Sequence, residues 1–298
     1  MQQAVLIVNP YSTKVTGDRI ALVEATLREQ VQLRTEFTRG PGHATELAAA
    51  AAGHADAIVV FAGDGTYNEA MNGADGALPF GFLPGGGTSV FPRALGLPRD
   101  PGEAARVVAT AIAKSRTRRI SLGAVNGRRF CFSAGIGFDG EAVRRLDKLG
   151  RDAAGARPGD FAFVRTVAKM LAERRGEWNP ALEIVGYGRA AFILVANCNP
   201  YTYAGSLPLQ VVPDARFELG LDFVAPERVR ALSVPRMLAY IVTGQGQLAA
   251  GDVYSGHDLD RIDVRCDRPL PLQADGEDLG DVEVAVFEAE RDAVSVLV

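Results

Sequence analysis

The stretch "VVFAGDGTYNEAMNG" (residues 59–73) passes from a short apolar run through a glycine-rich, acidic turn into a helical pattern. Thr66 and Glu69 have the Thr-x-x-Glu spacing of a capping box, in which two side chains satisfy free backbone N–H groups at a helix start. The stretch therefore predicts a strand, a turn and then a helix with Thr66 as its N-cap.

The capping box explains Thr66 and Glu69 but not the two glycines and the aspartate of the turn. Gly63 and Gly65 flank Asp64 directly after the strand, where glycine lets a ligand approach the backbone and a helix N-terminus attracts phosphate. An aspartate among phosphates repels them unless a cation such as Mg²⁺ lies between. Taken alone, the turn fits a nucleotide site and a plain tight turn equally well.

A second glycine turn favours the nucleotide site. In "FLPGGGTSVFPRALGLP" (residues 82–98), three consecutive glycines follow another short apolar run and precede a helical pattern. Pro92 must lie in the first turn of that helix, since a proline deeper inside costs about 3 kcal/mol, so the helix is predicted to begin near Ser89. Two such turns together indicate a phosphate cradle, although neither matches the P-loop or the dinucleotide fingerprint.

The first 120 residues place both turns in an α/β arrangement. Short apolar runs alternate with helical patterns, which is typical of a parallel, Rossmann-like sheet covered by crossover helices. Strands are predicted over residues 5–8, 31–37, 57–61 and 79–83, and helices over about 20–27 and 43–53. Ligands of open parallel sheets bind beyond the carboxyl ends of the strands, so both turns should face one crevice.

From residue 121 onward the pattern is antiparallel. In "RRISLGAVNGRRFCFSAG" (residues 118–135), Asn-Gly separates two strand-like runs, which is the strongest short-range hairpin signal. A second hairpin is predicted over residues 181–197 with its turn at 186–189, and a helical insertion over 159–176. We therefore predict a nucleotide-binding domain over residues 1–120 and a mainly antiparallel β-sandwich domain over 121–298.

Composition and charge exclude several classes of protein. The net charge of -4 gives no global attraction to nucleic acid or membrane, so nucleic-acid binding is not expected. The three cysteines lie far apart without CxxC spacing, which is typical of buried thiols in a reducing cytoplasm. The N-terminus begins a strand rather than a secretory signal, and no run reaches the roughly 18 apolar residues of a membrane span. We expect a cytoplasmic protein with at most peripheral contact at the inner membrane surface.

Five motifs, in order, resemble the diacylglycerol kinase catalytic family, which includes soluble bacterial lipid kinases and sphingosine kinases. They are "VNPYS" (8–12), "AGDGTYNEAMNG" (62–73), "LPGGGTSVFPRALGLP" (83–98), "SAGIGFDGEAV" (133–143) and "PLPLQADGE" (269–277). The resemblance covers essentially the whole chain and implies transfer of the γ-phosphoryl group of ATP to a lipid hydroxyl, with Mg²⁺ as cofactor. Diacylglycerol is the first candidate acceptor. The oligomeric state stays open, with a homodimer as one alternative.

The resemblance also implies the site residues. ATP is expected to lie in the cleft between the two domains, with Asp64 beside Mg²⁺. The implied nucleotide-binding residues are Asn9, Ser12, Thr38, Gly63, Asp64, Gly65, Thr66, Gly85, Gly86, Gly87 and Thr88.

The same resemblance implies that Asp275 is the general base for the acceptor hydroxyl. The residues support a paired arrangement independently, because alternation along an extended chain puts Gln273, Asp275 and Glu277 on one face. Two carboxylates are then predicted to point into a cleft together, one accepting a proton and the other holding a cation. The alternative reading is a solvated Asp-Gly turn.

Departures from the family pattern leave alternatives open. Ala62 replaces the first glycine of the family's GGDGT, and "GTSVF" (residues 87–91) lacks the acid that many bacterial members have there. Mg²⁺ therefore rests on fewer ligands or arrives with ATP. A kinase of a soluble substrate such as NAD, and a nucleotide- or lipid-binding protein without catalysis, remain rival hypotheses.

Two further features carry weaker expectations. Asp139 lies in a glycine-rich turn before a predicted helix, where it either caps that helix or faces a substrate cleft. A group of basic residues forms either a solvated face or a landing patch for anionic lipid. The group comprises the stretch "KSRTRRI" (residues 114–120) together with Arg144, Arg145, Lys148, Arg151, Arg157, Arg174 and Arg175.

Overall fold

The computed structural model describes residues 2–74, 76–150, 160–246 and 250–298, and the chain divides into two compact units. Unit 1 comprises residues 1–120 and 292–298, and unit 2 comprises residues 121–291. The domain expected over residues 121–298 therefore differs at its end, because the last residues return to unit 1. Arg151 and Arg157 of the basic group lie outside the described residues.

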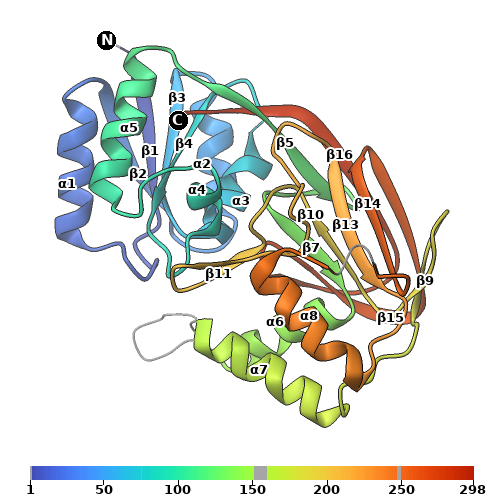
Figure 1. Cartoon of the computed structure of the whole chain (residues 1–298). Coiled ribbons are helices and arrows are strands. Elements are labelled where there is room, and N and C mark those ends of the chain that lie inside the picture. The colour runs from blue at the N-terminus through green and yellow to red at the C-terminus, as the bar shows by residue number, and fades with distance from the viewer. Residues whose placement is uncertain (1, 75, 151–159, 247–249) are drawn as a thin grey trace. The chain divides into compact units, whose positions relative to one another are not determined.

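Unit 1 contains a mainly parallel sheet with helices packed on it (Figure 1). Its strands lie in the order β4, β3, β1, β2, and all of these neighbours pair in parallel. The strand bounds are β1 (Gln3–Val8), β2 (Gln32–Phe37), β3 (Ala57–Ala62) and β4 (Phe80–Pro84). The helices are α1 (Gly17–Arg28), α2 (His43–Ala51), α3 (Asp64–Gly73), α4 (Val90–Ala94) and α5 (Pro101–Ala113).

The parallel α/β domain predicted from the sequence is confirmed. Every residue of β3 and β4 is buried, as expected for parallel strands covered on both faces. Pro92 occupies the first turn of α4, whose N-cap is Ser89, as predicted. The alanine-rich helix α2 ends at Ala51, two residues before the predicted Gly53.

The predicted N-cap of α3 is wrong. The helix begins at Asp64, with Gly63 in extended conformation (φ -102°, ψ 174°) as its N-cap. Thr66 lies inside the first turn, where it is buried and its Oγ1 accepts a hydrogen bond from Asn9 Nδ2 at 2.8 Å. Glu69 is consequently in the middle of the helix, so this pair does not form the capping box.

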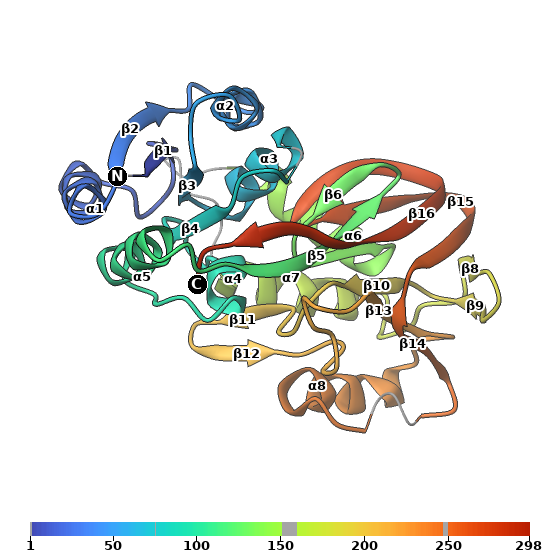
Figure 2. The ribbon, with the colours of Figure 1, turned by 90° about the horizontal axis from the view of Figure 1, so that it is seen from above.

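Unit 2 is rich in antiparallel strands, which Figure 2 shows from above. The strand order is β14, β13, β10, β7, β15, β16. The bounds are β5 (Arg118–Val125), β6 (Arg128–Phe130), β7 (Ser133–Ile136), β8 (Leu182–Ile184), β9 (Gly188–Ala190), β10 (Ile193–Ala196), β11 (Thr202–Ala204), β12 (Leu207–Leu209), β13 (Leu221–Pro226), β14 (Val253–Leu259), β15 (Arg261–Ala274) and β16 (Glu277–Val296). The helical elements are α6 (Phe138–Lys148), α7 (Asp160–Glu173), the 3-10 helix η1 (Ala231–Ser233) and α8 (Val234–Thr243).

Both hairpins predicted in unit 2 are present, but the turn of the second lies earlier in the sequence than predicted. Asn126 and Gly127 join β5 to β6 with positive φ at both positions, as a type I′ turn requires. The β8–β9 turn comes earlier than predicted, because Arg189 already pairs with Glu183 in the ladder. The predicted helical insertion is confirmed as α7. Alternating residues of the strands pack into one apolar core, which includes Phe130, Phe223 and Phe287.

Candidate functional site

The two glycine turns of unit 1 lie side by side at the carboxyl ends of β3 and β4. A Cβ atom added to Gly86 would lie 2.9 Å from Gly63 Cα, and one added to Gly85 would lie 2.8 Å from the Ala62 carbonyl oxygen. The packing of one turn against the other therefore requires glycine at these positions. Gly87 differs, because it is exposed and a Cβ there would meet nothing within 4 Å. A ligand can approach the backbone at Gly87.

Asp64 connects the first turn to the second. Its Oδ2 accepts a hydrogen bond from the Val90 N–H and its Oδ1 accepts one from the Phe91 N–H, each at 3.0 Å. Ser89, the N-cap of α4, makes no side-chain capping bond, and its Oγ instead accepts from the Gly86 N–H at 3.1 Å. Asp64 thus performs, from the neighbouring turn, the capping that the N-cap side chain usually performs. The sequence analysis missed this structural role.

Tyr67 joins the ends of the same two strands. Its hydroxyl lies 2.7 Å from the carbonyl oxygen of Ala62 in β3 and 2.6 Å from that of Leu83 in β4. The side chain is fully buried, and burial together with the nearby Asp64 charge raises the pKa of Tyr67 well above its ordinary value. The hydroxyl therefore stays protonated and holds both turns at one edge of the sheet.

The loop after β1 reaches both turns. Asn9 Nδ2 donates to Thr66 Oγ1 in α3, while Asn9 Oδ1 accepts from the Tyr11 N–H at 3.0 Å. Lys14 Nζ donates to the Gly87 carbonyl oxygen at 2.9 Å. Sequence reasoning missed Lys14, although a basic residue shortly after the first strand was visible. Asn9 and Lys14 therefore both lie with the glycine turns.

The other residues predicted to bind the nucleotide lie in several different parts of unit 1. Ser12 is half-buried in the β1 loop, and its N–H donates to the Asn9 carbonyl oxygen at 3.1 Å. Gly65 lies in the first turn of α3, and Thr88 is half-buried in the second glycine turn. Thr38 is buried at the end of β2, which is two strands away from β3 in the sheet. Thr38 is thus the least central of the predicted residues.

In unit 2, Asp275 lies in the turn of the β15–β16 hairpin and is buried. Its Oδ2 accepts from the Cys131 N–H at 2.6 Å, and its Oδ1 accepts from the N–H groups of Phe132 and Ser133 at 3.0 and 3.2 Å. Three backbone donors therefore hold this carboxylate. The reading of a solvated Asp-Gly turn is wrong for Asp275.

Asp275 and Glu277 do not point together, contrary to the prediction. Asp275 and Gly276 both have positive φ, so the extended alternation stops at Ala274 and the chain reverses. Glu277 begins β16, where its Oε2 accepts from Arg128 Nη2 at 2.7 Å. The turn geometry thus gives the two carboxylates different partners.

Asn197 supports the loop that holds Asp275. Its Nδ2 donates to the carbonyl oxygens of Ser121 and Cys131 at 2.8 and 3.1 Å, and its N–H donates to the Phe132 carbonyl oxygen at 2.9 Å. Asn197 is fully buried. Nothing in the local sequence distinguishes this asparagine, because its partners come from distant segments.

A buried polar network lies beneath the same turn. Gln273 Oε1 accepts from the Gly276 N–H at 2.9 Å, and Gln273 Nε2 donates to Asp139 Oδ2. Asp139 Oδ1 accepts from the Tyr201 hydroxyl at 2.6 Å. Burial raises the pKa of Asp139 to about 6, although both hydrogen bonds oppose the rise. The expectation that Asp139 caps α6 is wrong, since Gly137 is the N-cap and Asp139 contacts the hairpin instead.

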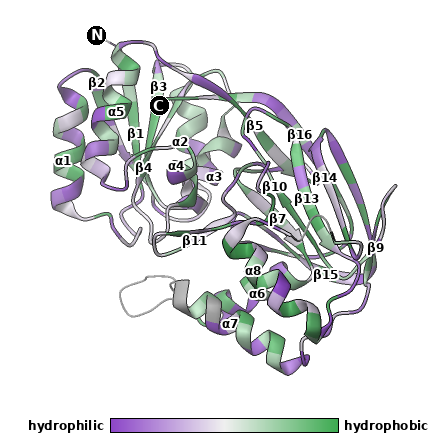
Figure 3. Cartoon of the chain, in the orientation of Figure 1, coloured by the Kyte–Doolittle hydropathy of each residue, from purple (hydrophilic) through white to green (hydrophobic). Residues whose placement is uncertain are grey.

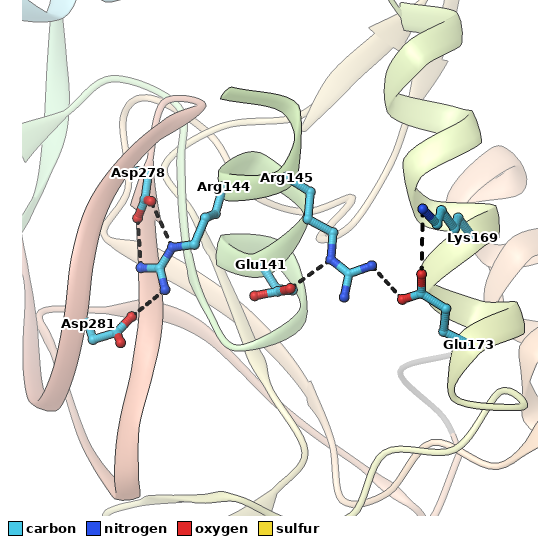
Figure 4. Close-up of polar contacts among 7 residues, drawn as sticks. All are labelled: Glu141, Arg144, Arg145, Lys169, Glu173, Asp278 and Asp281. Carbon is cyan, nitrogen blue, oxygen red and sulfur yellow. Dashed lines mark hydrogen bonds and ion pairs between the residues drawn. The ribbon is translucent and has the colours of Figure 1, made fainter. Parts of the chain in front are cut away.

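Helix α6 also holds the hairpin through ion pairs (Figure 4). Arg144 Nε lies 2.8 Å from Asp278 Oδ2, and Arg144 Nη1 lies 2.6 Å from Asp281 Oδ1. The guanidinium lowers the pKa of Asp278, chiefly by hydrogen bonding. Gly140 allows the close approach, because a Cβ there would overlap the Pro271 carbonyl oxygen. Helix α6 therefore positions the turn of the hairpin from two sides.

Arg145 extends the ion pairs toward α7. It contacts Glu141 at 2.7 Å and Glu173 at 2.6 Å, and Lys169 approaches Glu173 at 3.8 Å (Figure 4). Arg144 and Arg145 thus have acidic partners within the protein. These contacts favour the structural interpretation of this part of the basic group over a landing patch for anionic lipid.

Unit 2 also contains an apolar cavity of about 110 Å³. The space far exceeds the roughly 10–15 Å³ that one water molecule requires. Its lining comes from α6, α7, α8, β10 and β13 and consists of apolar and aromatic side chains, among them Phe138, Leu171, Trp178, Met237 and Ile241. A cavity with this lining suits a hydrocarbon chain better than a polar ligand.

In the part of the chain that the structure describes, no group of three or more His, Cys, Asp or Glu side chains could hold a metal ion. Among those same residues, no helix has the length and apolarity needed to cross a membrane.

The fold defines an α/β domain with two packed glycine turns, followed by a strand-rich unit, and comparisons with known proteins agree with this architecture. Residues 3–125 match the family model described as the diacylglycerol kinase catalytic domain. A diacylglycerol kinase of Bacillus subtilis (strain 168) is 37% identical over 144 residues, which span 46% of this chain and 46% of that protein. The match thus spans about half the length of the curated relative.

Solved structures extend the similarity to the whole fold. The crystal structure of a diacylglycerol kinase from Bacillus anthracis str. Sterne has a TM-score of 0.72 at 20% identity, covering 99% of this chain and 96% of that one. A second structure from that organism has a TM-score of 0.76 at 22% identity, covering 99% and 97%. At these identities the similarity shows the fold alone.

Proposed function

We propose that this protein is an ATP-dependent lipid kinase that transfers the γ-phosphoryl group of ATP to a lipid hydroxyl. The observation that carries the proposal is the pair of packed glycine turns in a domain that matches the diacylglycerol kinase catalytic domain. Phosphoryl transfer depends mainly on positioning and charge neutralisation. Turns held rigidly by Asp64 and Tyr67, with open backbone at Gly87, supply the positioning.

Within this proposal, unit 1 has a Rossmann-like sheet and binds ATP at the carboxyl ends of its strands. The triphosphate contacts the turns that contain Gly63, Gly65, Thr66, Gly85, Gly86, Gly87 and Thr88, with Asn9, Ser12 and Thr38 nearer the rest of the nucleotide. Lys14 lies at the second turn, where its ammonium group adds positive charge beside the phosphates.

Mg²⁺ is proposed to arrive with ATP. Mg²⁺ is usually held by one or two carboxylates together with substrate phosphates and waters. Asp64 fits such a shared site, because its carboxylate lies at the first glycine turn and the N–H groups of Val90 and Phe91 hold it in a fixed position there. Bound Mg²⁺ would neutralise charge on the phosphates.

Asp275 is proposed as the general base in unit 2. As the acceptor oxygen bonds to the γ-phosphorus and the bond to ADP breaks, the hydroxyl proton passes to the Asp275 carboxylate. Backbone donors from residues 131–133 hold that carboxylate in place, and Gln273, which contacts Asp139, accepts from the Gly276 N–H in the same turn. Glu277 pairs with Arg128 and is assigned only a supporting charge.

The apolar cavity of unit 2 supports a lipid as the acceptor. A cavity lined by α7, α8 and neighbouring strands offers space for an acyl chain of the acceptor. Diacylglycerol is the first candidate, because it is the acceptor named in the matching domain. A soluble polar acceptor gives no role to such a cavity.

The first test follows label from γ-labelled ATP into lipid extracts presented in mixed micelles. The native protein should label a lipid, and Asp275→Ala and Asp64→Ala should abolish the labelling. Because both carboxylates also hold backbone N–H groups, urea unfolding of each variant must show that it remains folded under assay conditions. Label in water-soluble products alone would favour a soluble acceptor such as NAD. ATP binding without any labelled acceptor would favour a binding protein.

Gly87→Ala tests the phosphate turn separately. A Cβ at this position meets no protein atom within 4 Å, so the free energy of unfolding should change by less than about 0.5 kcal/mol. The methyl group would obstruct approach of phosphate to the backbone, and the KM for ATP should rise roughly tenfold. Gly53→Ala, where a Cβ also meets nothing within 4 Å, is the control. An unchanged KM would remove this turn from the ATP site.

A further inference from the structure

Helix α8 has an apolar outer face. Its most exposed residues are Pro235, Leu238, Ala239, Val242 and Thr243, and Arg236, the charged residue of this helix, forms an ion pair with Asp252. The opposite face is apolar as well, because Val234, Met237 and Ile241 line the cavity. A surface helix of a globular protein normally turns charged residues toward water. The green that predominates along α8 in Figure 3 reflects this composition.

The preceding 3-10 helix extends the same surface. Leu232 in η1 is 94% exposed, which is the largest exposure among the large apolar side chains described. Leu238 and Val242, one turn apart in α8, are 50% and 48% exposed. We refer to Leu232, Leu238 and Val242 as the α8 face. An exposed cluster of this kind marks an interaction site more often than a solvated surface.

Basic side chains border the α8 face at its N-terminal end. Arg228 and Arg230 precede η1 and are exposed, and neither forms an ion pair with another described residue. Arg174 and Arg175 belong to a neighbouring segment, since Trp178 and Val229 exchange backbone hydrogen bonds at 3.0 Å. Glu177 and Glu227 offset part of this charge. The four arginines leave the border net positive.

Continuity with the cavity identifies what covers this face. Leu238 is both exposed and part of the cavity lining, so the helix separates an apolar interior from an apolar exterior. A lipid surface supplies hydrocarbon to both sides of the helix and anionic headgroups to the arginines. A protein partner or a second copy of the chain would explain the outer face but not its continuity with a cavity that is proposed to hold an acyl chain.

We propose that η1 and α8 dock the protein on an anionic lipid surface, with Leu232, Leu238 and Val242 entering the headgroup–acyl boundary. The helix lies in the plane of the interface, and the bordering arginines contact the headgroups. This inference rests on the proposed lipid acceptor, because docking brings the cavity to the layer in which that acceptor resides.

The test uses sedimentation of the full chain with vesicles, without ATP. The native protein should bind vesicles that contain phosphatidylglycerol more strongly than vesicles of phosphatidylcholine alone. The double variant Leu232→Glu, Val242→Glu should lose roughly tenfold or more in vesicle affinity. Neither residue lines the cavity, so phosphorylation of a short-chain, monomeric diacylglycerol should remain at the native rate. Phosphorylation of long-chain diacylglycerol in vesicles should fall.

Two further variants separate the apolar contribution to vesicle binding from the electrostatic one. Val284 is 58% exposed on β16 of the same unit, and Val284→Glu should leave vesicle binding unchanged. Arg228→Glu with Arg230→Glu should weaken binding to phosphatidylglycerol vesicles while sparing the weaker binding to phosphatidylcholine.

The outcomes also separate docking from catalysis. Native vesicle binding that the double variant retains would overturn the docking assignment, as would an absence of native binding. A native dimer that the double variant converts to monomers, without vesicle binding, would assign the face to a second copy. Vesicle binding that depends on the α8 face without any labelled lipid would contradict the proposed kinase function and support the docking alone.

Discussion

Asp139 is a buried carboxylate whose negative charge lowers stability at neutral pH. Burial raises its pKa from 3.8 to about 6, so the native protein takes up a proton at a pH where the unfolded chain is still ionised. Stability from this group therefore rises as the pH falls from about 6 toward 3.8, and the full cost is present above pH 6. Asp139 thus lowers the stability of the native protein at neutral pH while it supports the turn that contains Asp275.

Asp139→Asn should remove this pH dependence. At about pH 5, roughly one unit below the native pKa, the native protein regains about 1.4 kcal/mol relative to pH 7.5, and the variant does not. Urea unfolding of both proteins at the two pH values measures the difference, and subtraction cancels the carboxylates whose pKa is lowered, such as Asp278. A difference between the two proteins that is the same at both pH values would contradict the assigned charge state.

The two aspartates at the turns also show how much of the site can be predicted from the sequence alone. Residue types and spacing pointed to Asp64, and the family resemblance pointed to Asp275; both lie at turns that hold structure around them. Their partners were not predictable, because Val90, Phe91 and Cys131 donate from segments distant in sequence. A local pattern indicates what a side chain can accept, whereas the fold decides which donors meet it.

At the scale of elements, the paired glycine turns behave as one unit. Gly63 and Gly86 pack against each other, Tyr67 joins the strand ends, and Asp64 caps α4. The sequence predicted the strands and placed the turns at one edge, because strand and helix periods are local. It misplaced the start of α3, since the competing N-cap at Gly63 depends only on backbone conformation.

Gly86→Ala should separate the two turns. The added Cβ would lie 2.9 Å from Gly63 Cα, so the backbone must shift and the Asp64 cap on α4 must lengthen. We expect a loss of about 1–3 kcal/mol in the free energy of unfolding, together with weaker ATP binding. Urea unfolding and ATP titration measure the two effects, with Gly87→Ala as the neighbouring variant that should leave stability intact. Equal stability losses in both variants would contradict the packing account.

At the scale of the whole molecule, the chain enters unit 2 after residue 120 and returns to unit 1 at residue 292. The return comes from β16, a strand of 20 residues that pairs with β15 in one unit and reaches β4 in the other. The sequence analysis assigned residues 121–298 to one domain, because β16 crosses the boundary at residue 292 without a break in its strand-like pattern. Pairing between residues 80 and 296 is a long-range property that no local pattern encodes.

Residues 292–298, where the chain returns to unit 1, should stabilise unit 1 rather than unit 2. Val294 and Val296 are fully buried, and the neighbouring Leu297 N–H donates to the Phe80 carbonyl oxygen at 2.8 Å. Truncating both valines to alanine should cost roughly 2 kcal/mol each, a large share of the stability of one unit. Residue-resolved hydrogen exchange should then show faster exchange in β1, β3 and β4, with the strands of unit 2 retaining their protection. Val284→Ala, an exposed position on the same strand, should change neither unit. Faster exchange confined to unit 2 would show that the strand end belongs, energetically, to the domain that the sequence suggested.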